Sequence, residues 1–94
     1  MEVRSNKLTT GKILKSFRNR FGLSQKEVAS AMEISVPNLS ALENDRRKIG
    51  ADLAGRFAVI YGVRVERLLF PNGLKAIKGY KKLLNIKTKF KKLD

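Results

Sequence analysis

The 94-residue chain contains no cysteine, no histidine and no tryptophan, and it has only eight acidic residues. Without cysteine it forms no disulfide, thiolate metal site or thiol nucleophile, which fits a reducing compartment. Without histidine it lacks the commonest general base and the commonest metal ligand. The eight carboxylates show no tight pairing along the sequence. We therefore expect a protein that is not an enzyme and that needs neither a metal nor a cofactor.

Long hydrophobic runs are missing too. No apolar stretch approaches the roughly 20 residues of a membrane-spanning helix, and the first seven residues are too polar for a secretory signal. These absences predict a cytoplasmic protein that does not span a membrane. The length predicts one small domain with room for a tail.

What the chain has is positive charge: 21 Lys and Arg give a net charge of +13. This predicts a polyanionic partner, which is DNA, RNA or an acidic membrane surface; the blander reading is a generically basic protein. Residues 1–71 carry net +6, and residues 72–94 carry eight lysines and one aspartate, net +7. The turn signal Phe70-Pro71-Asn72-Gly73 separates them. We expect a domain over 9–71 and a basic C-terminal tail over 72–94.

Apolar residues in the first part recur with a helical period, as in Leu14, Phe17 and Phe21. No stretch there alternates like a strand. The pattern predicts an all-α domain of five short helices, near residues 10–21, 25–32, 36–44, 51–61 and 65–70.

Two of these helices have clear starts. Ser24 with Glu27 three residues later is a capping box, and Ser35 caps the next helix, with Pro37 in its first turn. Leu39 and Leu42 would form the inner face of that second helix. Two short helices joined by a tight turn can hold the second helix out from the body and into a DNA groove.

The tail is ambiguous. Leu74, Ile77, Tyr80 and Leu84 have helical spacing, whereas residues 84–91 alternate as in a strand. We expect a short helix over 74–84 followed by a strand or a disordered end, with a flexible lysine-rich arm as the alternative. Apolar Ile86 and Phe90 would be wasted on a purely electrostatic arm, which favours a role in assembly over a role on DNA.

The order Ser24-Gln25-Lys26-Glu27-Val28-Ala29, Ile34-Ser35 and Leu39-Ser40-Ala41-Leu42-Glu43-Asn44 resembles the Cro and phage-repressor type of helix-turn-helix, also called XRE-like. The resemblance covers about residues 11–71 and excludes the tail. It implies a five-helix, repressor-like domain, usually dimeric, that binds operator DNA and controls transcription.

The resemblance also implies roles for single residues. Gln25 matches a glutamine that touches the DNA backbone, and Arg18 and Glu43 match a pair that meets inside the domain. The residues expected at the DNA are Gln25, Ser35, Val36, Pro37, Asn38, Ser40, Ala41, Asn44, Arg46, Arg47 and Lys48. Alternatives without DNA contact remain open: Gln25 could be an exposed helix residue, Asn38 could cap its own helix, and residues 46–48 could form a solvated loop.

Two positions depart from the family pattern, since Glu33 and Asp45 stand where glycine is usual. A positive φ at Glu33 would strain the turn by about 1 kcal/mol, whereas aspartate tolerates it better. Val36, Pro37 and Ala41 cannot hydrogen-bond to bases, although they can contact thymine methyl groups. Direct readout would therefore be sparse, and specificity would depend partly on DNA shape.

The first functional hypothesis is a dimeric, sequence-specific repressor, in which Val59, Leu69 and Phe70 form a dimer patch or are scattered surface residues. The second is the antitoxin of a toxin–antitoxin pair, which would bind its own operator and a toxin. The third is a weakly specific RNA-binding or nucleoid protein that acts through the tail.

Overall fold

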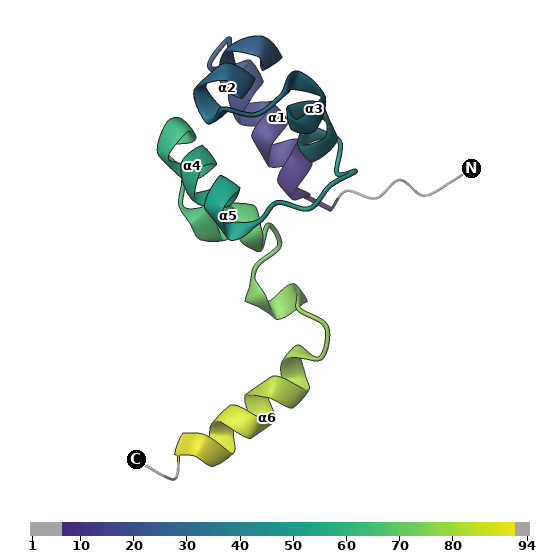
Figure 1. The fold of residues 1–94 in the computed structure, drawn as a ribbon. Coiled ribbons are helices and arrows are strands. Elements are labelled where there is room, and N and C mark those ends of the chain that lie inside the picture. Colours follow the sequence, from purple (N-terminus) through teal and green to yellow (C-terminus); the bar gives the residue numbers. More distant parts are fainter. Residues whose placement is uncertain (1–6, 92–94) are drawn as a thin grey trace, which may run out of the picture.

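The structure, a computed structural model, describes residues 7–91, with side chains as far as Lys89. Its elements are α1 (Thr10–Arg20), α2 (Gln25–Met32), α3 (Val36–Glu43), α4 (Ala51–Tyr61), α5 (Val65–Leu69), the 3₁₀ helix η1 (Leu74–Ala76) and α6 (Tyr80–Lys91). There is no strand between residues 7 and 91. Helices α1 to α5 form one body, and α6 stands away from it beyond η1 (Figure 1). The expected all-α class is confirmed, and the five body helices end within one residue of their predicted bounds.

Local capping explains where the helices begin. Thr9 accepts a hydrogen bond from the Lys12 amide at the start of α1. Ser24 and Glu27 form the predicted capping box at α2, and Ser35 caps α3 by accepting from the Asn38 amide. Each cap satisfies an amide that the helix itself leaves unpaired, which is worth about 1 kcal/mol.

The core lies between the five body helices: α1 packs against α3, α4 and α5, and α2 packs against α3 and α4. Leu14 of α1 and Phe57 of α4 are completely buried. The other large side chains buried with them are Val28, Met32, Leu39, Leu42 and Leu68. Burying one such side chain contributes roughly 1.5–3 kcal/mol, so this cluster fixes the position of α3 on the body.

Tyr61 closes one side of the core. Its ring stacks on Phe17 with centroids 5.6 Å apart and on Phe57 with centroids 5.9 Å apart. The residue is 4% exposed, and its buried hydroxyl has no hydrogen-bond partner. Burial raises the pKa of Tyr61 to about 12, because the phenolate would lose its hydration.

The prediction for the tail is wrong in two respects. No helix runs over 74–84, because Ile77 is extended and Gly79 takes a left-handed φ of 78°, so that the chain bends between η1 and α6. No strand follows either, because residues 80–91 are helical. A lone alternating segment has no neighbouring strand to bond with, whereas a helix satisfies its own amides, and Leu and Lys are good helix formers.

Gly11 is placed where α1 comes closest to the end of α3. A Cβ at residue 11 would lie 2.5 Å from the carbonyl oxygen of Glu43 and 2.8 Å from Asp45 Oδ1. Only a residue without a side chain permits this approach. The sequence did not predict this role of Gly11. By contrast, a Cβ at Gly55 in α4 would meet nothing within 4 Å.

We therefore expect Gly11→Ala to destabilise the fold by roughly 1–3 kcal/mol, as other overpacked sites do. The matched variant Gly55→Ala should stabilise it by about 0.5–1 kcal/mol, since alanine favours a helix interior. Urea unfolding followed by circular dichroism measures both. Equal shifts of the two midpoints would show that the α1–α3 approach is looser than described.

Candidate nucleic-acid interface

The turn between α2 and α3 sets the angle of the second helix. It is made by Glu33, whose φ of 60° and ψ of 41° are left-handed. The Glu33 amide donates to the Ser30 carbonyl oxygen, and the Ile34 amide donates to that of Ala29. Both bonds close the end of α2. The conformation that usually needs glycine is therefore adopted here by glutamate, at a strain of about 1 kcal/mol.

Helix α3 has one buried and one open side. Leu39 and Leu42 are 0% and 1% exposed, as expected of its inner face. Val36 and Pro37 are exposed at its first turn, whereas Asn38, Ser40 and Ala41 are half-buried along it. The helix thus presents a short outer face of small and apolar side chains around one amide.

A buried carboxylate joins α3 to the two helices before it. Glu43 Oε2 lies 2.7 Å from Arg18 Nε, and Oε1 lies 3.1 Å from Arg18 Nη2. The Glu43 side chain is completely buried and that of Arg18 is 12% exposed. Arg18 Nη1 also donates to the Leu23 carbonyl oxygen. The hydrogen bond to Glu43 raises the pKa of Arg18, so the Arg18 guanidinium stays charged.

Gln25 takes part in the same cluster. Its Nε2 donates to Glu43 Oε1 at 3.1 Å, and its side chain is half-buried. The simple picture of Gln25 as an exposed helix residue is therefore wrong. An amide nitrogen has a second hydrogen, so this contact fixes the side chain at the start of α2 and leaves one donor for a phosphate.

The polar residues around the outer face of α3 are also bonded to one another. Arg47 Nη1 donates to Asn38 Oδ1, so the oxygen of that amide is already engaged. Asn44 Nδ2 donates to the Ser40 carbonyl oxygen at 2.8 Å, and Arg46 Nη2 approaches Ser40 Oγ at 3.4 Å. Asn44 therefore closes the end of α3, and the two arginines are placed beside its outer face.

Asp45 has a role that the sequence reasoning missed. Its φ is 59°, and its carboxylate accepts from the Gly11 amide at 2.9 Å and from Thr9 Oγ1 at 2.6 Å. It thereby ties the loop after α3 to the start of α1. The glycine usual at this position could relax the backbone but could not make these bonds.

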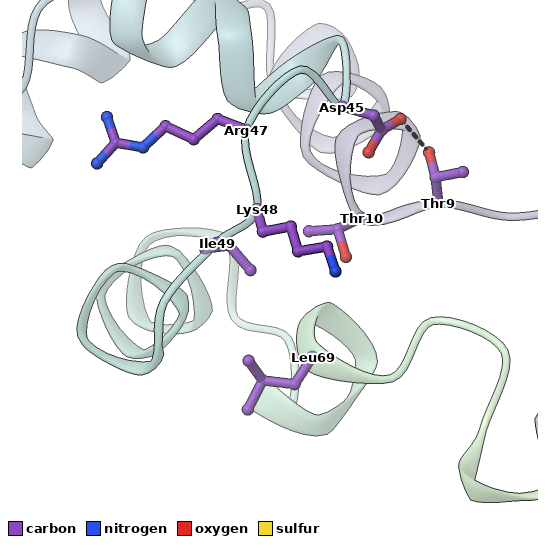
Figure 2. Close-up of a pocket in the computed structure, with 7 residues that line it drawn as sticks. All are labelled: Thr9, Thr10, Asp45, Arg47, Lys48, Ile49 and Leu69. Atoms are coloured by element: carbon purple, nitrogen blue, oxygen red, sulfur yellow. Dashed lines mark hydrogen bonds between the residues drawn. The ribbon is translucent and has the colours of Figure 1, made fainter. Parts of the chain in front are cut away.

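The same loop borders a surface hollow of about 410 Å³ (Figure 2). Thr9 is bonded to Asp45, and Thr10 Oγ1 donates to the Leu68 carbonyl oxygen. Lys48 lies along the hollow, whereas the Arg47 side chain points away from it. Arg46, Arg47 and Lys48 are all exposed, so three adjacent cations lie in the loop after α3, beyond Asn44 and Asp45.

The acidic side chains of residues 7–89 form no group of three or more that could hold a metal ion. Among the helices described, none is long and apolar enough to cross a membrane.

A helix-turn-helix with its second helix projecting beside a basic loop defines a class of DNA-binding domains. The profile of a family described as helix-turn-helix matches residues 14–68, which is more than half of the chain. The chain belongs to this helix-turn-helix family, in its XRE-like form.

Two similar proteins agree with this assignment. The propionyl-CoA carboxylase regulator of Cereibacter sphaeroides is 34% identical over 64 residues, which are 68% of this chain but only 14% of that regulator. A chain of the SinR protein/SinI protein complex superimposes with a TM-score of 0.60 at 20% identity, over 85% of this chain and 79% of that one. The second likeness shows the shared fold.

The Glu43 cluster can be tested by unfolding. Glu43→Ala removes the carboxylate that pairs with Arg18. Complete burial of Arg18 would make this cost roughly 3–5 kcal/mol, and the cost should fall at or below the lower end because Arg18 is 12% exposed and keeps its bond to the Leu23 carbonyl oxygen. Asp52→Ala is a matched control, because Asp52 is 80% exposed in its pair with Arg56 and an exposed pair contributes at most about 1 kcal/mol. Urea midpoints by circular dichroism measure both. Should the two variants unfold at the same urea concentration, Glu43 would not hold the three helices together.

Proposed function

We propose that this chain is a transcriptional regulator, and that it is a sequence-specific repressor that reads operator DNA with α3 as a dimer. One observation supports this most: the inner face of α3 is buried, while its outer face stands open between Gln25 and the cations that follow Asn44. A helix placed in this way can enter the major groove while its flanks meet phosphates. Such a regulator acts in the compartment that holds the DNA, which agrees with the expected cytoplasmic location.

Side-chain chemistry indicates which residues would contact bases and which would contact phosphates. Val36, Pro37 and Ala41 would contact thymine methyl groups, and Asn38 would hydrogen-bond to a base edge. The exposed loop cations would contact phosphates, as would Gln25, Ser35, Ser40 and Asn44 where their remaining donors allow. Because only one side chain on the reading face hydrogen-bonds well to bases, DNA shape would supply part of the specificity.

Arg47 has two parts in this proposal. It adds a positive charge beside the groove helix, and it holds the oxygen of the Asn38 amide. Because the Asn38 oxygen accepts this bond, the NH₂ group of Asn38 is the part of the amide that is available to DNA. We therefore propose that Asn38 donates to an acceptor, such as guanine O6 or N7 or adenine N7, rather than forming the two-bond pairing with adenine.

The DNA-binding roles can be separated by salt dependence, using a site selected from a random-sequence duplex library. Removing one cation from the phosphate backbone should lower the slope of log K against log salt by about 0.9. Arg47→Ala should lower this slope on selected and random duplexes alike, and Asn38→Ala should cost roughly 1–3 kcal/mol on the selected duplex only. Fluorescence anisotropy at several salt concentrations measures both quantities.

Arg64→Ala is the control, because Arg64 is 83% exposed but lies between α4 and α5 rather than beside α3. It should leave both DNA affinities nearly unchanged. If no preferred site can be selected, or if Arg64→Ala weakens binding as much as Arg47→Ala, the chain coats nucleic acid through its overall charge. That outcome would support the RNA-binding or nucleoid alternative.

The dimer is proposed because one helix of eight residues contacts too few bases for useful specificity. Val59 is 83% exposed on α4, and Leu69 and Phe70 are 36% and 41% exposed at the end of α5. Apolar side chains that gather in one exposed patch often mark an interface, and we propose that these three residues form such a patch. Two copies paired there would present their α3 helices to successive major grooves about 34 Å apart.

Val59→Glu should therefore break the dimer, since it would bury an unpaired charge in the interface. Analytical ultracentrifugation with and without a palindromic selected site checks this, with Ala31→Glu on the exposed side of α2 as a control that should leave association unchanged. A wild-type chain that stays monomeric both alone and on the palindrome would contradict the dimer.

A protein partner is the second proposal, and the antitoxin hypothesis is its most specific form. The neighbouring SinR chain is itself in a complex with a second protein. In the present chain the surface that suits a partner is the tail.

A further inference from the structure

Helix α6 carries more exposed large apolar side chains than any body helix does. Along α6, Leu83, Leu84 and Ile86 are 57%, 40% and 45% exposed, and Leu74 of η1 is 58% exposed. Helix α6 packs against η1 and projects from the body (Figure 1). An isolated helix of twelve residues is marginally stable in water, and most helices gain stability by packing an apolar face. These features indicate that a partner covers this face.

The face is concave where the chain bends at Gly79. A hollow of about 680 Å³ lies between the end of η1 and the first turn of α6, and its apolar side chains are Ile77, Tyr80 and Leu84. Four lysines surround them: Lys75, Lys78, Lys81 and Lys82. An apolar hollow bordered by cations is complementary to a partner surface that is convex, apolar at its centre and acidic at its edges.

Lys87 adds a charge inside the apolar face itself. It follows Leu83 by four residues, Leu84 by three and Tyr80 by seven, and these spacings place it among them on one side of the helix. A charged residue in a helix–helix seam is tolerated where the partner supplies the opposite charge. The only charged residues in α6 are lysines, so the α6 of a second copy would supply no opposite charge.

We propose that η1 and α6 form a docking surface for an acidic amphipathic helix of a partner protein. The apolar side chains of the partner helix fill the hollow and cover Leu83 and Leu84, and its carboxylates pair with Lys87 and the surrounding lysines. DNA would leave the apolar side chains uncovered. A bilayer surface is flat and fits the hollow poorly. This surface is independent of the DNA-binding face, so its test is independent of the proposed function.

The test uses the full chain and a fluorescently labelled, designed 21-residue helix with leucine on one face and glutamate on the other. One control peptide has glutamine for each glutamate, and a second has the same composition in scrambled order. We expect the acidic amphipathic peptide to bind at least about tenfold more tightly than either control by anisotropy. If the scrambled peptide bound with equal affinity, net charge alone would explain the binding, and the proposal would be overturned.

Variants of α6 locate the contact. Leu84→Ser should weaken peptide binding about tenfold, whereas Asn85→Ser on the adjoining polar face should not. Lys87→Glu should weaken it similarly, and a peptide with lysine in place of one central glutamate should restore it. Affinity for duplex DNA should stay unchanged in all three variants, which separates failure here from failure of the DNA-binding proposal.

Three other results would overturn the proposal in favour of another occupant. Loss of self-association in Leu84→Ser would assign the face to a second copy of the chain. Binding to vesicles containing phosphatidylserine that depends on Leu84, without binding of the acidic peptide, would assign it to a membrane. A loss of duplex affinity in Leu84→Ser equal to that in Lys82→Ser would assign it to DNA.

Discussion

The buried carboxylate of Glu43 is the constraint on which the arrangement of the reading helix depends. Arg18 of α1 and Gln25 of α2 both donate to it, so one side chain at the end of α3 fixes three helices. A buried charge is tolerated only when it is paired and hydrogen-bonded, which makes this geometry restrictive. The direction of α3 is therefore set at its buried end, while its first turn and outer side stay open for DNA.

Near this cluster, two positions that usually hold glycine in the family hold Glu33 and Asp45 instead, and the two replacements differ in what they contribute to the structure. Glu33 takes the left-handed conformation, and its side chain makes no hydrogen bond or ion pair within the described residues that would offset the strain. Asp45 takes it too but binds the start of α1 through Gly11 and Thr9. The loop that carries the cations is thus anchored immediately before Arg46. Anchoring reduces the entropy lost when these side chains meet phosphates.

The helices of the body could be predicted because their signals are local: serine caps, an apolar stripe and a glycine at the end of α4. The contacts of Asp45 and Gly11 could not, because they join residues more than 30 positions apart. The strand predicted in the tail was wrong because residues 84–91 match both periods, and only the absence of a pairing strand decides between them. Which side chains of the interface contact DNA remains a prediction, since sequence and geometry indicate exposure and chemistry but not occupancy.

The central claim is that DNA binds along α3 and its flanks rather than along the lysine-rich tail. Amide NMR spectra of the labelled protein, titrated with a selected duplex, test this most directly. The account predicts that the largest shift changes fall at Gln25, at residues 35–41 and at residues 44–48, with small changes in α4 and α6. Shift changes confined to α6, or spread evenly over the lysines of the whole chain, would contradict it.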